Sequence, residues 1–206
     1  MFQKLFAFLL AAMVSVSGIA GDIPGGQVRD AEGLMPNTFE VMLSPEVVFQ
    51  NGGIYLNSEL RYQASEDVGV GFGFGSGEMG YNFGGYGVWY IIPDLQSQPA
   101  VSLLGGMYFN SLKLENYFVL RFSPTVSKRF VMGWGNLTPY WAMQFSPSFS
   151  FGAAPNVFSI RTVMGSQVNV HALGGLRLWL EFGLGIVNGL NEFALGISYP
   201  FSGLNG

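Results

Sequence analysis

Apolar and polar side chains alternate along most of this chain, from about Thr38 to Phe201. In one representative segment, Leu56 and Leu60 fall on one parity, whereas Glu59 and Arg61 fall on the other. Because successive side chains of a strand point to opposite faces, each such segment indicates a strand with one apolar and one polar face. The apolar parity carries no charge in any of these segments. Strands of this kind, closed into a cylinder, give an apolar outside and a polar inside, which is typical of a transmembrane β-barrel.

Turn signals such as Gln50–Gly52 and Asn188–Gly189 separate the alternating segments. We therefore predict an all-β fold, a closed antiparallel up-and-down transmembrane β-barrel of about ten strands. Eight strands is the alternative, if two of the segments belong to long loops. The predicted strands cover residues 38–47, 54–62, 68–75, 79–91, 100–109, 117–127, 138–149, 157–170, 176–186 and 193–201.

The composition favours a membrane protein over a soluble one. Only 11% of the 206 residues are charged, against roughly 25% in ordinary soluble domains. A soluble β-sandwich of an exported protein is the competing interpretation, but a sandwich places its polar residues outside. Here the larger and more uniform apolar set is the face without charge. The net charge of −4 and the scattered basic residues do not indicate a nucleic-acid-binding surface, and the absence of cysteine excludes disulfides.

The first residues have the pattern of an export signal. Lys4 precedes an apolar run over Leu5–Val14, and Gly18 and Ala20 supply small residues before a cleavage site. The run is shorter than the about 20 residues that a membrane-spanning helix needs. We expect a cleaved signal peptide at 1–20, a flexible N-terminal lead at 21–36 that tucks partly into the barrel mouth, the barrel at 37–201 and a short C-terminal tail at 202–206.

Eight charged residues fall on the parity that would face the lumen, four of each sign. Charges in a confined space are costly unless they are paired, so we expect ion pairs across the barrel that fill the lumen. Inward glycines in the segments at 68–75, 79–91 and 176–186 leave a water-filled passage or a ligand cavity open as the alternative. The predicted lumen network consists of Glu40, Glu46, Glu59, Arg61, Arg121, Arg161, Arg177 and Glu181.

Two further expectations concern prolines and aromatic residues. Pro45, Pro124 and Pro147 each follow a serine within a predicted strand, and because proline lacks a ladder donor, we expect a β-bulge at each. Aromatic residues gather toward the strand ends, where barrels carry interfacial girdles. The expected girdles are Tyr62, Trp89, Tyr90, Trp134, Tyr140, Trp141 and Tyr199 at one end and Phe49, Tyr55, Phe74, Tyr81, Phe109, Tyr117 and Phe151 at the other.

Candidate chemistry is sparse. His171 is the only histidine, and no serine lies near it in the sequence for a nucleophilic triad. The residues Gly75–Gly80 match G-x-G-x-x-G, but no helix pattern follows, so the dinucleotide-binding interpretation fails. We expect no catalytic residue, no metal site and no cofactor, and thus no enzyme.

The segment Glu192–Phe201, with sequence EFALGISYPF, resembles the closing strand of small bacterial outer-membrane barrels of the OmpA/OmpX-like superfamily. The chain departs from that pattern by continuing past the last aromatic residue with Ser202–Gly206. The resemblance implies an integral protein of the bacterial outer membrane, in contact with its lipids and inserted by the barrel assembly machinery. A monomer with a structural or envelope role is expected, a narrow channel or small-ligand carrier is the alternative, and an outer-membrane enzyme is less favoured.

Overall fold

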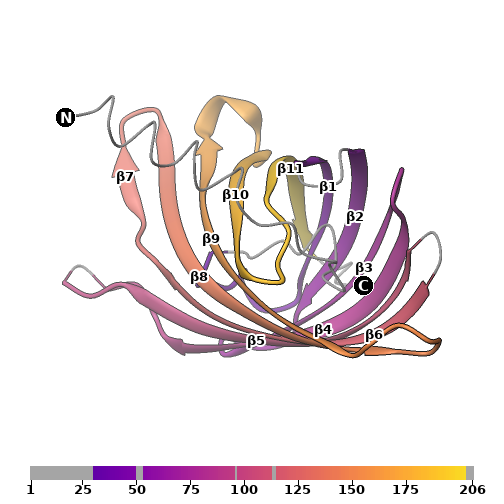
Figure 1. Cartoon of the computed structure of the whole chain (residues 1–206). Helices are drawn as coiled ribbons and strands as arrows, with labels where there is room; N and C mark the ends of the chain where they lie inside the picture. Colours follow the sequence, from indigo (N-terminus) through magenta and orange to yellow (C-terminus); the bar gives the residue numbers. More distant parts are fainter. Residues whose placement is uncertain (1–29, 50–52, 96, 113–114, 203–206) are drawn as a thin grey trace, which may run out of the picture.

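The computed structural model describes residues 30–49, 53–95, 97–112 and 115–202, and nearly all of them lie in curved antiparallel strands (Figure 1). The signal peptide and most of the lead predicted above, together with residues 203–206 of the tail, lie outside these ranges. The strands are β1 (Thr38–Val48), β2 (Gly53–Gln63), β3 (Val68–Gly77), β4 (Gly80–Ile92), β5 (Ala100–Leu112), β6 (Glu115–Ser127), β7 (Phe130–Met132), β8 (Gly135–Ser150), β9 (Val157–Val170), β10 (Arg177–Val187) and β11 (Glu192–Ser202).

Ten of these strands close into a barrel. Each pairs with its sequence neighbours, β6 pairs with β8, and β1 pairs with β11 to complete the cylinder. The three-residue strand β7 pairs only with the start of β8 and forms a small hairpin that extends the wall at one end. The predicted ten-strand up-and-down barrel is therefore confirmed, and eight strands is wrong. The sequence pattern did not reveal β7, which is too short to show an alternation.

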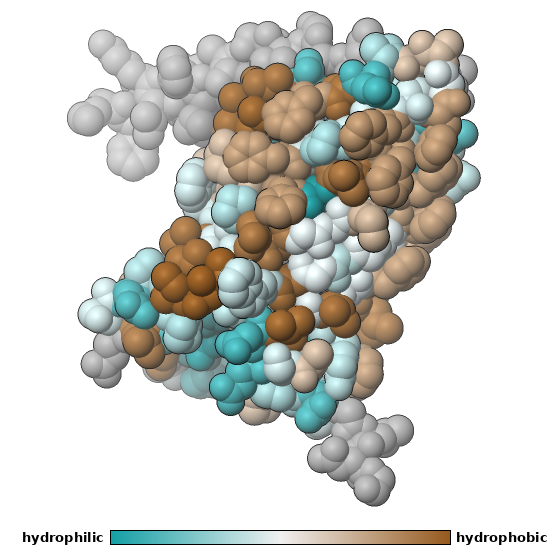
Figure 2. Space-filling model, turned by 90° about the horizontal axis from the view of Figure 1, so that it is seen from below, coloured by the Kyte–Doolittle hydropathy of each residue, from teal (hydrophilic) through white to brown (hydrophobic). Residues whose placement is uncertain are grey.

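The two faces of the wall differ in polarity as the alternation predicts. In β1, Leu43 is 45% exposed, whereas its neighbours Met42 and Ser44 are each 1% exposed. Apolar side chains cover much of the molecular surface in the view of Figure 2. The outward set from all parts of the wall includes Val41, Leu56, Leu60, Phe72, Phe83, Met107, Phe122, Trp141, Phe158, Leu180, Phe182, Leu195 and Ile197.

The prolines do not produce bulges, so that prediction is wrong. The strand registers run unchanged past Pro45, Pro124 and Pro147. Bridge pairs are nevertheless missing beside each proline. At Pro45 they are missing from the β1–β11 ladder between Leu43 and Glu46, and at Pro124 and Pro147 from the β6–β8 ladder. Loss of the proline donor therefore interrupts one ladder without inserting a residue. The register shifts occur elsewhere, between Tyr90 and Ile92 and between Gly185 and Val187.

The connections between strands are short at both ends of the barrel. The only helical element in the described ranges is a single 3₁₀ turn, η1 (His171–Leu173), in the connection from β9 to β10. None of the described residues forms a helix that is long and apolar enough to cross a membrane. The end of the barrel where β1 begins and β11 finishes is called the terminal end below, and the opposite end the hairpin end.

Candidate functional site

All eight charged residues predicted for the lumen lie on the inward face. Six are almost fully buried, whereas Glu59 and Arg177 are partly exposed. Their contacts group around a few centres, each of which includes neutral side chains.

The first cluster surrounds Glu40 at the terminal end. Arg61 Nη1 lies 3.6 Å from Glu40 Oε2, and Arg177 Nη1 lies 3.5 Å from Glu40 Oε1. The Ser198 hydroxyl also donates to Glu40 Oε1 at 2.9 Å and accepts from Trp179 Nε1 at 2.8 Å. Because Arg61 and Glu40 face each other on β2 and β1, the register of this hairpin places one ion pair directly, and the curvature of the wall brings Arg177 to the other side.

The second cluster lies toward the hairpin end and includes a residue that the sequence prediction missed. Arg161 Nη1 lies 2.5 Å from Glu192 Oε1, and Arg161 Nε donates to Gln144 Oε1 at 2.9 Å. Glu192 is the first residue of β11 and has the inward parity of that strand. This parity could have identified it as a lumen residue from the sequence. Glu46 accepts from Asn57 Nδ2 at 2.8 Å in the same half of the lumen.

Tyrosine side chains contact the three remaining charged residues, Glu181, Glu59 and Arg121. Tyr140 donates from its hydroxyl to Glu181 Oε2 at 2.7 Å, and Tyr86 donates to Glu59. The Arg121 guanidinium lies over the ring of Tyr108, 4.7 Å from its centroid. Arg121 forms no ion pair with any described carboxylate, so the expectation of an ion pair is wrong for this residue. A cation over an aromatic face compensates part of the cost of its burial.

Two of the inward glycines, Gly71 and Gly165, are covered by these same tyrosine rings. A Cβ on Gly71 would lie 2.2 Å from Tyr86 Cζ, and one on Gly165 would lie 2.3 Å from Tyr140 Cζ. Each glycine lies directly across the ladder from its tyrosine. Each of these two rings occupies the space beside its glycine. Tyr55, Tyr90, Tyr117 and Tyr140 are buried on the inward face, so their assignment to the interfacial girdles is wrong.

Replacing Gly71 by alanine is expected to destabilise the barrel by about 1–3 kcal/mol, because the new methyl would overlap the Tyr86 ring and force it out of place. Gly105→Ala is the matched control, since a Cβ there meets no atom within 4 Å. Urea unfolding of both variants in detergent micelles measures the difference. Equal midpoints for the two variants would show that the ring does not depend on the glycine.

Different groups lie at the two ends of the lumen. At the hairpin end, Val48 and Leu190 are buried against each other, with Met79 packed on them. At the terminal end, the described part of the lead, residues 30–36, enters the barrel and Ala31 and Leu34 are buried. The predicted entry of the lead into the mouth therefore agrees with the placement of these residues.

The lead is attached to the wall by backbone hydrogen bonds and by an ion pair of one acidic side chain. The Ala31 amide donates to Ser127 Oγ at 2.9 Å, and the Leu34 amide donates to Gln63 Oε1 at 3.2 Å. Glu32 pairs with Arg129, which lies between β6 and β7. Three contacts to β2, β6 and the following connection fix the segment across the mouth.

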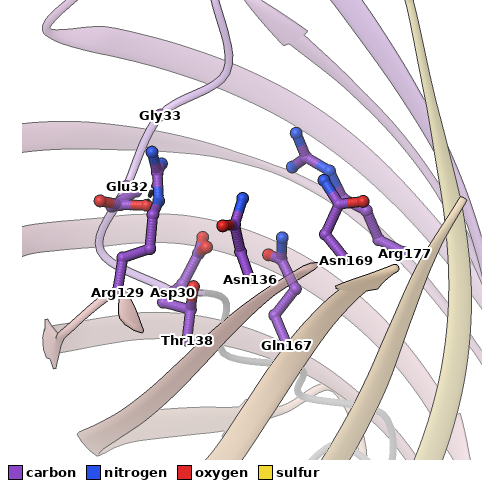
Figure 3. A pocket seen from close by; sticks show the side chains of 9 residues that line it. All are labelled: Asp30, Glu32, Gly33, Arg129, Asn136, Thr138, Gln167, Asn169 and Arg177. Carbon is purple, nitrogen blue, oxygen red and sulfur yellow. Dashed lines mark hydrogen bonds and ion pairs between the residues drawn. The ribbon is translucent and has the colours of Figure 1, made fainter. Parts of the chain in front are cut away.

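A polar pocket of about 150 Å³ lies between the lead and the wall (Figure 3). Asp30, Glu32 and Gly33 form one side, and side chains from β8, β9 and β10 form the other. The wall residues occur in two rows across the ladder: Thr138 opposite Gln167, and Asn136, Asn169 and Arg177 nearer the opening. Arg129 completes the lining. Every lining residue except Gly33 has a polar side chain.

Burial changes the acidity of the two lead carboxyls. Desolvation raises the pKa of Asp30 to about 6, although Arg61 and Arg177 act in the opposite direction. Desolvation also raises the pKa of Glu32, against the effect of Arg129. Asp30 therefore titrates close to neutral pH, with its charge facing the pocket.

The docked lead is expected to loosen as the pH rises from about 4 to about 6. The pKa of Asp30 is about 6 in the folded chain against 3.8 for a free aspartate, so its protonated form favours docking below the lower value, and this contribution is lost as the pH passes the higher one. Hydrogen exchange at the Ala31 and Leu34 amides measures this, with Asp30→Asn as the reference at each pH.

At pH 3, below both pKa values, the two proteins should protect these amides alike, whereas at pH 8 the variant should protect them better. Lower protection in the variant at pH 8 would mean that attraction to Arg61 and Arg177 outweighs desolvation.

His171, the candidate for catalysis considered from the sequence, lies outside the lumen. His171 is exposed in η1, and its amide donates to the Trp134 carbonyl at 3.2 Å. Among the described residues no group of three or more histidine, aspartate or glutamate side chains is arranged to hold a metal ion.

Comparisons with known proteins assign no family to this chain. No family model matches the chain, and no curated protein matches it. Among solved structures, an outer membrane channel from Pseudomonas putida F1 aligns over 87% of this chain and 99% of its own, with 11% identity and a TM-score of 0.42. The beta domain of the Bordetella autotransporter BrkA aligns over 80% of this chain and 98% of its own, with 11% identity and a TM-score of 0.37. Both are outer-membrane barrels, and neither match specifies the OmpA/OmpX-like superfamily.

Proposed function

We propose that the protein is an integral, non-enzymatic β-barrel of the bacterial outer membrane with a sealed lumen and a structural role in the envelope. Hydrocarbon would contact the uncharged outer face, because no water-exposed domain leaves so continuous an apolar surface uncovered. The observation that supports membrane insertion is the pairing of that face with buried inward charges such as Arg61 and Arg161, each 1% exposed.

The sealed state is supported by what fills the interior. Tyrosines and aliphatic residues of β4, β5 and β6 pack in one half, around Tyr86, Val88 and Leu104. The arginine–carboxylate clusters occupy the other half. Leu190 at the hairpin end and the lead at the terminal end would close the two mouths of the barrel, which supports the proposed sealed state. Side chains can fill the interior of a barrel of about eight strands, and the diameter grows roughly in proportion to the number of strands, so ten strands remain far narrower than the about 16–18 strands of an open porin.

The proposed partners follow from the same picture. Outer-membrane lipids would surround a monomer, because the apolar face extends around the barrel and is not a single patch. The barrel assembly machinery would insert it, with the terminal end in the periplasm. The short connections at both ends offer no large loop for adhesion.

Conductance in planar lipid bilayers tests the sealed state. The mature protein is expected to insert without steady openings. A variant lacking residues 30–36 should remain closed as well, because Val48 and Leu190 still close the hairpin end. Steady single-channel steps from the intact protein would overturn the structural role in favour of a narrow channel.

A further inference from the structure

We propose that the polar pocket at the terminal end binds a small zwitterion of the α-amino acid type, with its ammonium group toward Asp30 and Gln167 and its carboxylate toward Arg177. The site goes beyond a structural role and needs only that the lead is docked in the folded barrel. It involves the pocket residues shown in Figure 3.

Three buried polar atoms in this pocket have no hydrogen-bond partner within the described part of the chain. They are Asp30 Oδ1, Gln167 Oε1 and Arg177 Nε. Asp30 is 5% exposed and Gln167 is 6% exposed. Buried polar atoms are almost always satisfied in native proteins, so three from separate elements around one cavity point to an occupant that supplies their partners.

The unsatisfied atoms specify the chemistry of that occupant. Two are acceptors, on Asp30 and Gln167, and one is a donor, on Arg177. A ligand with several N–H donors at one end and an oxygen acceptor at the other satisfies all three. A primary ammonium provides three donors, and a carboxylate is the preferred acceptor for a guanidinium.

The charges that line the pocket favour a ligand that is neutral overall. Glu32 is compensated by Arg129, and Arg177 lies 3.5 Å from Glu40. Asp30 has no ion pair at contact distance and interacts with Arg61 and Arg177 only through the longer-range field. In Figure 3 Asp30 lies on the side of Arg129 and Thr138, whereas Arg177 lies beyond Gln167 on the far side. A molecule with opposite charges at its two ends matches this separation.

The volume and the opening of the pocket limit the size of the ligand. A volume of about 150 Å³ corresponds to about five waters at the ~30 Å³ each occupies in the liquid. That volume suits a small amino acid and excludes a peptide or an oligosaccharide. The inner row, Thr138 and Gln167, is buried, whereas Asn136, Asn169 and Arg177 are partly exposed, so the pocket is open on the side away from the lumen.

Binding of L-alanine to the mature protein in detergent micelles tests the proposal, at pH 7.5, by calorimetry or saturation-transfer NMR. Saturable one-to-one binding is expected. Ethylamine, which lacks the carboxylate, and propionate, which lacks the ammonium, should each bind at least tenfold more weakly.

The variants Asp30→Asn and Arg177→Gln should each weaken L-alanine binding at least tenfold. Asp67→Asn, in the exposed turn from β2 to β3 at the same end, is the matched control and should bind as the parent does. Asp30 lies outside the strands, so its variant reports on the site even where Arg177→Gln fails to show the gel migration of the folded barrel.

Three results would overturn the site: no saturable binding of L-alanine, equal binding of ethylamine or propionate, or full binding by the folded Asp30→Asn variant. The first would mean that the unpartnered atoms do not mark an amino-acid site. None of them bears on the sealed lumen, which conductance tests separately.

Discussion

Replacing Arg161 by leucine is expected to destabilise the folded barrel by about 3–5 kcal/mol. Arg161 and Glu192 are 1% and 2% exposed, and their ion pair spans 2.5 Å. Removing the arginine alone leaves a carboxylate buried without its cation, which is the costly outcome for a buried pair. Urea unfolding in detergent micelles, followed by tryptophan fluorescence, measures the loss.

The double variant Arg161→Leu/Glu192→Leu should recover most of that stability, because an apolar pair of similar volume often replaces a buried ion pair at little cost. Arg129→Leu is the control at the mouth, where the Arg129 side chain is 46% exposed and the loss should stay within about 1 kcal/mol. If the single and double variants at Arg161 unfolded at the same denaturant concentration, the ion pair would not be the reason for the loss.

Replacing Leu43 by arginine is expected to cost about 2–4 kcal/mol when the barrel is folded in lipid vesicles. Leu43 lies at the middle of β1 with its side chain exposed outward. An arginine there would face the centre of the hydrocarbon layer, where its charge is costly.

Val47→Arg is the matched control for this prediction. Val47 is on the same face of the same strand but near its end, where the cost falls to about 0–1 kcal/mol. Comparing the two unfolding free energies in vesicles tests the dependence on depth. Equal and small losses at both positions would indicate an outer face bathed by water.

The sequence predicted the elements of this fold that depend on local pattern. Alternation over residues such as Leu56, Glu59 and Arg61 is a property of each strand alone, so the strands, their number and their inward faces could be recognised. Closure of the sheet was predicted from the uncharged apolar face repeated on every strand, and the pairing of β1 with β11 confirms it. The short strand β7 lacked enough residues to show a period.

The parts that depend on how strands are aligned with one another could not be recognised in the same way. Tyr86 covers Gly71 because the register of β3 and β4 places them opposite each other, and an alternation pattern carries no register. Tyr140 was assigned to the interface from its place near a strand end, although its parity, opposite to that of the outward Trp141, already pointed inward. Pro124 was expected to cause a bulge, but the effect of its missing donor depends on which neighbouring strand it faces.

The polar pocket shows the same limit more strongly. It joins Asp30 of the lead to Gln167 and Arg177 on two strands far along the chain. The sequence indicated that the lead enters the mouth and that Arg177 faces inward. It held no signal that Asp30 and Gln167 would line one pocket, because their proximity depends on how the closed wall and the lead are arranged in space.

Contact between the outer face and hydrocarbon is tested most directly by tryptophan quenching in vesicles of lipids brominated on their acyl chains. Single-tryptophan variants, with phenylalanine at the other three positions, compare Trp89 and Trp141, which are 56% and 48% exposed, with Trp179, which is 6% exposed inside the lumen. Strong quenching at Trp89 and Trp141 and weak quenching at Trp179 is the predicted result. Quenching of Trp89 and Trp141 no stronger than that of Trp179, with both accessible to a water-soluble quencher, would contradict it.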